Sequence, residues 1–209
     1  MGAGPERSSE SGSLEECKRA LRLRMSARRR VFPRDSAAAA GRSAAELLEL
    51  LEEFQRADAV ALYAALRDEL PTRPVFDACT RRGAMRLLPR CTAGGNLEFA
   101  SVERWEDLRP GRYGVLEPPA ERAAIPLERA DLVVIPGVAF DRAGRRLGRG
   151  QGYYDRALSS GAARMPFRVG FAFAFQLMGR VPTGPLDRDV DAVVTDEEIL
   201  RAAQKGTTR

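Results

Sequence analysis

The sequence of 209 residues contains no histidine. This absence excludes Ser-His-Asp and Cys-His catalysis, acid–base chemistry by imidazole, and every zinc site that needs a histidine ligand. Cysteine is scarce: Cys17, Cys79 and Cys91 are odd in number and have no metal-ligand spacing, which favours free thiols in a reducing compartment. No apolar run approaches the roughly 20 residues that span a bilayer, and residues 1–13 lack the apolar core of a signal peptide. We therefore expect a cytoplasmic protein with no membrane partner.

Positive charge is present in excess, but only in one segment. The net charge is +5, from 34 basic and 29 acidic residues. Residues 18–34 contain no acid and eight bases, and without them 26 basic residues face 29 acidic ones. The eight bases are Lys18, Arg19, Arg22, Arg24, Arg28, Arg29, Arg30 and Arg34. This segment is either a solvated helix face or a helix that binds phosphates of a nucleotide or of nucleic acid.

The rest of the chain alternates between apolar runs and helical patterns. The strands are predicted at 59–63, 85–89, 97–102, 132–136, 169–173 and 192–195, and the helices at 14–30, 37–55, 72–82, from about 153, and at 197–204. The run at 132–136 is continuous and uncharged, which is typical of a strand buried on both faces of a parallel sheet. We predict a single α/β domain over 14–204, a Rossmann-like three-layer α/β/α fold with a mostly parallel central sheet, between a disordered tail at 1–13 and a loose tail at 205–209.

The richest stretch for chemistry is a glycine- and arginine-rich loop after the strand at 132–136. It holds Gly144, Gly148, Gly150 and Gly152, the arginines Arg145, Arg146 and Arg149, and then Tyr153, Tyr154 and Asp155. Glycines allow a close approach of backbone to ligand, arginine forks match phosphate or carboxylate oxygens, and the start of the next helix favours an anion. The tyrosines offer stacking for a flat ring, and the aspartate offers an oxygen ligand for magnesium. The alternative is a surface turn with solvated arginines. Neither the P-loop nor the dinucleotide-binding fingerprint is present.

This loop, PGVAFDRAGRRLGRGQGYYDR, resembles the signature of the 5-formyltetrahydrofolate cyclo-ligase family. Further similar pieces follow in the family's order: Lys18–Arg22, Tyr63–Glu69, Leu88–Arg90, Gly114–Pro118, VGFAFAFQL, and VPTGPLDRDVDAVVTDE. The resemblance covers roughly residues 14–200 and implies a catalytic three-layer α/β domain. It also implies that ATP and Mg²⁺ are used to convert 5-formyltetrahydrofolate into 5,10-methenyltetrahydrofolate, with release of ADP and phosphate. The formyl oxygen would be phosphorylated, after which N10 attacks the carbon and phosphate leaves. Such chemistry suits a chain without histidine, because phosphoryl transfer needs mainly positioning and positive charge.

The resemblance implies roles for individual residues. The ATP-binding residues would be Lys18, Arg19, Arg22, Arg145, Arg146, Leu147, Gly148, Arg149, Gly150, Gln151, Gly152, Tyr153 and Tyr154. The folate-binding residues would be Ala64, Glu69, Tyr113, Arg149, Gly150, Gln151, Gly152 and Tyr153. Arg145 and Arg149 would be catalytic, and Asp155 and Asp187 would hold magnesium. The chain departs from the family at Leu186, where a histidine or another polar residue is common, and at Gln151, where glycine or lysine is usual.

Two other functions remain open from the sequence. One is a nucleic-acid-binding protein that reuses the fold, with the basic helix and the arginine loop along a phosphate backbone. Acids at Glu69, Asp155 and Asp187 argue against it, because they would repel a polyanion. The other is a folate-binding sensor without turnover. We expect the partners to be a folate and ATP, with no nucleic acid, and the protein to be a monomer.

Overall fold

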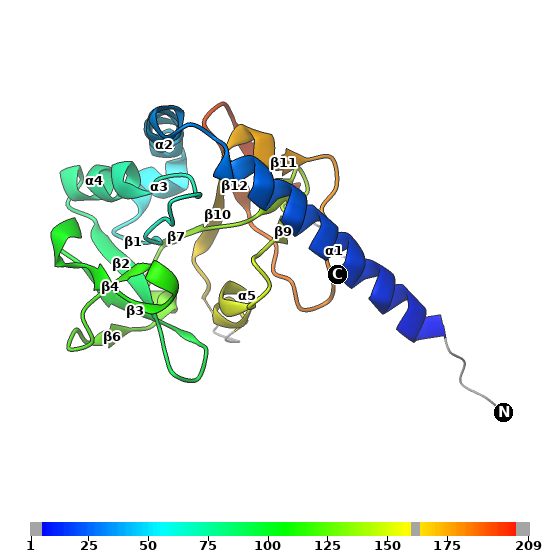
Figure 1. Cartoon of the computed structure of the whole chain (residues 1–209). Helices are drawn as coiled ribbons and strands as arrows, with labels where there is room; N and C mark the ends of the chain where they lie inside the picture. Colours follow the sequence, from blue (N-terminus) through cyan, green and yellow to red (C-terminus); the bar gives the residue numbers. More distant parts are fainter. Residues whose placement is uncertain (1–5, 160–163, 204–209) are drawn as a thin grey trace, which may run out of the picture.

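The computed structural model describes residues 6–159 and 164–203, and Figure 1 shows a large central sheet with helices around it. The strand order of the sheet is β13-β12-β10-β7-β1-β2-β3-β6. The bounds are β1 Ala59–Ala61, β2 Met85–Cys91, β3 Leu97–Ser101, β6 Ala124–Ile125, β7 Leu132–Ile135, β10 Phe167–Phe171, β12 Ala192–Val194 and β13 Ile199–Arg201. The five strands from β12 to β2 are parallel to one another, and the outer strands β13, β3 and β6 are antiparallel to their neighbours. The predicted α/β class with a mostly parallel sheet is confirmed.

Helices cover one face of this sheet. Helices α2 (Arg34–Glu49), α3 (Glu52–Arg56) and α4 (Arg73–Arg81) pack there. The predicted helix at 37–55 is thus two helices, because the backbone is extended at Leu51. A small hairpin, β4 (Arg109–Pro110) with β5 (Leu116–Glu117), lies beyond. Short 3-10 helices complete the chain: η1 Trp105–Asp107, η2 Arg112–Gly114, η3 Leu127–Arg129 and η4 Ala174–Gln176.

The other face carries a second sheet that the sequence did not predict. Its strands β8 (Ala139–Asp141), β9 (Arg146–Leu147) and β11 (Leu177–Met178) have the order β11-β8-β9. The helices on this side are the short α5 (Tyr153–Ala157) and the long α1 (Glu6–Arg30). The third layer of the predicted α/β/α fold is therefore mixed, with α1 packed on the small sheet rather than on the central one.

Successive side chains of the central strands point to opposite faces of the sheet, so that each face has its own hydrophobic core. Leu132 and Val134 face α2–α4, whereas Val133 and Ile135 face the side of α5 and the small sheet. All four side chains are fully buried, as expected for a strand covered on both faces. Phe140 of β8 fills the second core and lies against the backbone of two glycines, Gly137 and Gly170.

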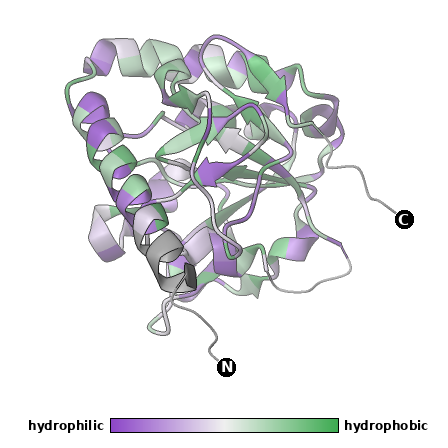
Figure 2. Ribbon diagram, turned by 90° about the vertical axis from the view of Figure 1, so that its right-hand side faces the viewer, coloured by the Kyte–Doolittle hydropathy of each residue, from purple (hydrophilic) through white to green (hydrophobic). Residues whose placement is uncertain are grey.

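In the part of helix α1 that Figure 2 colours, hydrophilic and hydrophobic residues alternate along the helix. Leu21 and Met25 bury against Val138, Ala139 and Leu147 of the small sheet. The helix begins at Glu6, whereas the sequence predicts a disordered tail at 1–13 and a helix from residue 14; residues 1–5 lie outside the described part. Extending an existing helix costs little compared with starting one, which explains the early start. None of the described helices is long and apolar enough to cross a membrane.

The predicted helix at 197–204 is wrong. The Thr195 hydroxyl accepts hydrogen bonds from the backbone N–H groups of Glu197 and Glu198 and so closes a tight turn. The chain reverses there and forms β13, which pairs antiparallel with β12, Leu200 opposite Val193. Pairing at the sheet edge overrides the helical propensity of this segment. Residue 204 and the predicted tail at 205–209 lie outside the described residues.

Candidate active site

A cavity of about 440 Å³ opens at the carboxyl ends of three neighbouring parallel strands, β7, β1 and β2. Its lining includes residues directly after β1 and β7 and at the end of β2, which is where ligands bind in open parallel sheets. The glycine-rich loop and the start of α5 form another wall. The lining residues are Tyr63, Ala64, Leu66, Glu69, Pro89, Cys91, Leu97, Tyr113, Val115, Glu117, Pro136, Gly137, Arg146, Gly148, Arg149, Gln151, Gly152, Tyr153, Tyr154 and Asp155.

The glycine-rich loop leads from β9 into α5 through two turns that require glycine. Gly150 has φ of 104° and Gly152 has φ of 66°, both in the region that disfavours side chains. Gly152 is the N-cap of α5, and the Gly148 carbonyl accepts a hydrogen bond of 3.0 Å from Nε of Arg22. The loop therefore takes its shape from glycines and from a cation of α1.

A buried ion pair lies under this loop. Arg146 is 3% exposed and its Nη2 lies 2.5 Å from Oδ1 of Asp155, which also accepts from the backbone N–H of Arg188 at 3.1 Å. Among the described residues, Nε of Arg146 and the hydroxyl of Tyr154 are buried without a hydrogen-bond partner. Burial raises the pKa of the Tyr154 hydroxyl, which therefore stays protonated and able to donate. Two unpaired polar groups at one wall of a cavity indicate a polar ligand, since buried polar groups are normally paired.

Two acids and two arginines form a neutral cluster that reaches the cavity through Glu69 and Arg149. Nε of Arg149 donates to Oε1 of Glu69 at 3.0 Å, and Nη2 donates to Oδ1 of Asp68 at 2.8 Å. The other Asp68 oxygen accepts from Arg29 of α1, also at 2.8 Å. Arg29 is 2% exposed and also donates to the Gly137 carbonyl at 3.3 Å. Sequence reasoning missed Asp68 and Arg29; the only signal was that Asp68 precedes Glu69 and that Arg29 belongs to the basic segment.

Helix α1 reaches the far side of the loop through Lys18. This side chain is 6% exposed, and its Nζ lies 2.7 Å from Oδ2 of Asp187. Asp187 also accepts from the backbone N–H of Gly184 at 2.6 Å, and it is adjacent in sequence to Arg188, which binds Asp155. Asp187 lines a second, wider depression rather than the 440 Å³ cavity. The structure thus brings the two predicted magnesium carboxylates to the same region from distant segments.

Of the eight predicted folate residues, all but Gly150 line the cavity. Ala64 and Glu69 are buried, while Tyr113 is 62% exposed and has a positive φ of 59°. A hydrogen bond with Tyr113 raises the pKa of Tyr153. Cys91 lies beside Tyr153, and burial followed by the negative charge of Glu117 raises the pKa of its thiol. An aromatic pair at the mouth of a partly apolar cavity suits a flat heterocyclic ligand.

Six of the predicted ATP residues do not line the cavity: Lys18, Arg19, Arg22, Arg145, Leu147 and Gly150. Of these, Lys18 binds Asp187 and Arg22 binds the Gly148 carbonyl of the glycine loop. Arg19 is exposed on the outward face of α1. Arg145 pairs with the buried Asp141 at 2.7 Å, in the turn between β8 and β9. Leu147 is buried in the core between α1 and the small sheet. The geometry therefore concentrates the positive groups at the site in Lys18, Arg22, Arg146 and Arg149.

The structure offers two carboxylates, Asp155 and Asp187, for the predicted magnesium ion. Within the residues that the structure describes, no group of three or more acidic, cysteine or histidine side chains could hold a metal ion. Asp155 and Asp187 each bind protein donors through one oxygen, Oδ1 and Oδ2 respectively. Magnesium in nucleotide sites is commonly held by one or two carboxylates together with phosphates and water, so this pair suits a metal that arrives with a nucleotide.

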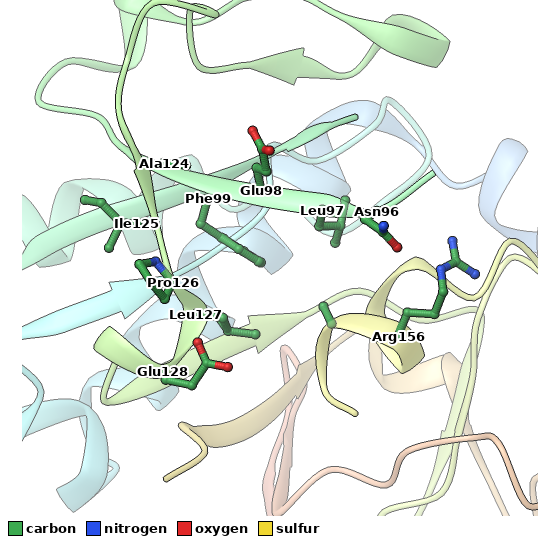
Figure 3. A pocket seen from close by; sticks show the side chains of 11 residues that line it. Asn96, Leu97, Glu98, Phe99, Ala124, Ile125, Pro126, Leu127, Glu128 and Arg156 are labelled. Atoms are coloured by element: carbon green, nitrogen blue, oxygen red, sulfur yellow. The ribbon is translucent and has the colours of Figure 1, made fainter. Parts of the chain in front are cut away.

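A smaller hollow of about 380 Å³ lies between the edge of the central sheet and α5 (Figure 3). Apolar side chains of β3, β6 and η3 form most of it, among them Phe99, Ile125 and Leu127. Arg156 stands at its rim, and its guanidinium donates to the carbonyls of Gln151 and Gly95. The glycine loop does not line this hollow, which shares only Leu97 with the lining of the 440 Å³ cavity.

Comparison with known proteins gives consistent results. The family model described as "5-formyltetrahydrofolate cyclo-ligase family" matches residues 14–196. The 5-formyltetrahydrofolate cyclo-ligase of Escherichia coli K12 is 32% identical over 175 residues, which cover 82% of this chain and 96% of that protein. The probable 5-formyltetrahydrofolate cyclo-ligase of Schizosaccharomyces pombe is 32% identical over 165 residues, 72% of this chain and 81% of that protein. The structure of Aquifex aeolicus 5,10-methenyltetrahydrofolate synthetase is 30% identical and superposes with a TM-score of 0.79 over 92% of this chain and 96% of that one.

Proposed function

Because the chain belongs to the 5-formyltetrahydrofolate cyclo-ligase family and is an enzyme of that family, we propose that it converts 5-formyltetrahydrofolate into 5,10-methenyltetrahydrofolate at the 440 Å³ cavity, consuming ATP in a magnesium-dependent reaction. One observation carries the proposal. The glycine loop, which suits phosphates, and Glu69, which suits the N–H groups of a pterin, line the same cavity. A folate and the end of a nucleotide would therefore meet there.

The chain supplies positive charge from several directions for the phosphates. Lys18 and Arg22 approach from α1, Arg146 lies beneath the loop, and Arg149 lies in the loop itself. The amide groups of the loop and the first turn of α5 add donors. Magnesium, when bound by Asp155 and Asp187 with the nucleotide, would neutralise phosphate charge.

The reaction that we propose has two steps, the first at phosphorus and the second at the formyl carbon. The formyl oxygen of the folate attacks the γ-phosphorus and ADP leaves. N10 then attacks the formyl carbon and gives its proton to the departing phosphate, which leaves with the former formyl oxygen. In both steps charge moves over phosphoryl oxygens, so fixed cations accelerate them without a titrating base. Arg149 is the residue suited to this task, because 43% of its side chain is exposed at the cavity and its guanidinium is already held on two sides.

The test is the absorbance of methenyl product, with 5-formyltetrahydrofolate, ATP and Mg²⁺ present together or omitted one at a time. We expect product only when all three are present. Arg149→Lys should lower kcat by roughly 10²-fold, the scale for losing one preorganised donor. Arg145→Lys is the matched control, since Arg145 lies outside the cavity lining and should lose little. Folate binding without product in any mixture would instead indicate a sensor, and equal product without ATP would refute the ligase reaction.

A further inference from the structure

In the cluster formed by Arg29, Asp68, Glu69 and Arg149, the two acids differ in their access to the cavity. Glu69 lines the cavity, whereas Asp68 does not. One oxygen of Asp68 accepts a hydrogen bond from Arg149, and its other oxygen accepts from the buried Arg29. The other oxygen of Glu69, Oε2, accepts from the backbone N–H of Leu66 at 3.0 Å, so a ligand that hydrogen-bonds to Oε1 of Glu69 competes there with Arg149 and leaves the contact of Arg149 with Asp68 intact.

We propose that Asp68 is the positioning residue for Arg149, and that it holds the guanidinium in place through the reaction while Glu69 turns to the substrate. This inference rests on the proposed function, in which Glu69 binds the pterin and Arg149 stabilises the transferring phosphoryl group. Without Asp68, a pterin on Glu69 would leave Arg149 with no fixed partner in the described part of the chain. With Asp68, Nη2 stays anchored, and Nη1, which donates no hydrogen bond among the described residues, remains available for the phosphoryl oxygens.

The anchor behind Asp68 is rigid. Arg29 is almost completely buried, and its two terminal nitrogens are both used, one on Asp68 and one on the Gly137 carbonyl directly after β7. The chain of contacts runs from the central sheet through Arg29 and Asp68 to Arg149. Burial raises the pKa of Asp68, but the guanidinium groups of Arg29 and Arg149 outweigh this effect and hold its pKa below the ordinary value. The carboxylate is therefore ionised at neutral pH.

The experiment compares Asp68→Asn, Arg149→Lys and the double variant in the methenyl assay. Asp68→Asn keeps the shape of the side chain but removes its charge. We expect kcat to fall by about tenfold or more, within the roughly 10²-fold that a misplacement of 1 Å produces, and KM for the folate to change little. In the Arg149→Lys background the same substitution should cause no further loss, because the group that it positions is already absent.

Asp77→Asn is the matched control, because Asp77 pairs with Arg73 on the surface of α4, away from the cavity. A second measurement does not depend on turnover. In a nitrogen–proton correlation spectrum, the Nη–H signals of Arg149, assigned by their loss in Arg149→Lys, should exchange faster with water in Asp68→Asn than in the wild type, because Nη2 is the nitrogen that donates to Asp68. Thermal melting of each variant reports whether it is folded, and Asp68→Glu provides a charged replacement that should recover part of kcat.

The outcomes separate the two hypotheses. Wild-type kcat in Asp68→Asn, or an equal loss of kcat with and without Arg149, would overturn the positioning role and leave the proposed function standing. An inactive wild type would overturn the proposed function, and the exchange rate of Arg149 would then decide whether Asp68 holds this side chain. An unchanged exchange rate overturns the inference in every case.

Discussion

The ion pair between Lys18 and Asp187 gives the sharpest test of how α1 contributes to the site. Asp187 has two tasks in our interpretation: it binds magnesium, and it neutralises a lysine that is 6% exposed. Asp187→Asn removes the charge and keeps an oxygen for the backbone N–H of Gly184. Lys18→Met removes the cation and keeps most of the side-chain length. The two variants and their combination form a double-mutant cycle.

The magnitude follows from burial. Removing one partner of a buried ion pair costs about 3–5 kcal/mol. The Asp187 side chain is 20% exposed, and Glu15 lies 3.5 Å from the Lys18 ammonium as a second, exposed carboxylate. Both facts reduce the loss, so we expect about 2 kcal/mol for Asp187→Asn. In the Lys18→Met background the same change should cost about 1 kcal/mol or less, because no buried cation is left unpaired.

Urea unfolding measures these free energies, and a magnesium titration of methenyl formation separates the two tasks. Asp187→Asn should raise the magnesium concentration needed for half-maximal rate, whereas Lys18→Met should raise KM for ATP instead. Equal destabilisation by Asp187→Asn in both backgrounds would refute the ion-pair argument. An unchanged magnesium titration in Asp187→Asn would refute its role as a metal ligand.

Three further predictions follow from burial and close packing. Gly170→Ala should lower the free energy of unfolding by about 1–3 kcal/mol, because a Cβ there would stand nearer to the Phe140 ring than the 3.0 Å that real Cβ atoms keep. Alkylation of Cys91 should slow when 5-formyltetrahydrofolate is added, since this thiol lines the cavity, while the fully buried Cys79, whose pKa burial raises to about 12, should not react in the folded protein. Asp68 has a pKa below its ordinary value of 3.8, so its contribution to stability is complete above that value and is lost as pH falls through the lower pKa.

Each of these predictions has an internal control. Gly179→Ala, where nothing lies within 4 Å of the added carbon, should leave the unfolding curve unchanged. Cys17 is exposed on α1 and should be alkylated at the same rate with and without folate. The stability difference between wild type and Asp68→Asn should be constant at neutral pH and shrink in acid; a difference that persists at the lowest pH would contradict the linkage. Protection of Cys17 by folate, or full reactivity of Cys79, would contradict the described cavity and core.

The central sheet could be predicted because its main strands are continuous apolar runs, whereas the segments on either side of each run are polar. Leu132–Ile135 is apolar on both faces, and the structure buries both faces. The small sheet could not be predicted in the same way. Arg146–Leu147 is only two residues long and lies in a stretch rich in glycine and arginine, which indicates a loop. Its pairing depends on the turn that Asp141 holds by accepting from the backbone of Ala143 and Arg145, a contact that no periodicity reveals.

The part of the candidate site that could be predicted from the sequence is the part formed by residues close together in the chain. The loop from Gly148 to Asp155 lines the cavity at nearly every position, as its composition indicated. The sequence could not distinguish Arg145 from Arg149, because both stand beside glycine; only the fold shows that one faces Asp141 and the other the cavity. Nor could it indicate Arg29, whose partner Asp68 is 39 residues away.

Helix α1 has a consequence for biosynthesis. Its three inward cations bind partners that lie 39, 126 and 169 residues further along the chain, at Asp68, Gly148 and Asp187. The ribosome therefore completes α1 long before it makes Asp187. Until then the apolar side and the cations of this helix are exposed to solvent. The side of the cavity at which we propose that phosphates bind is complete only when the last strands of the central sheet are in place. A nascent chain that lacks these strands exposes a basic amphipathic helix to chaperones and has no assembled site.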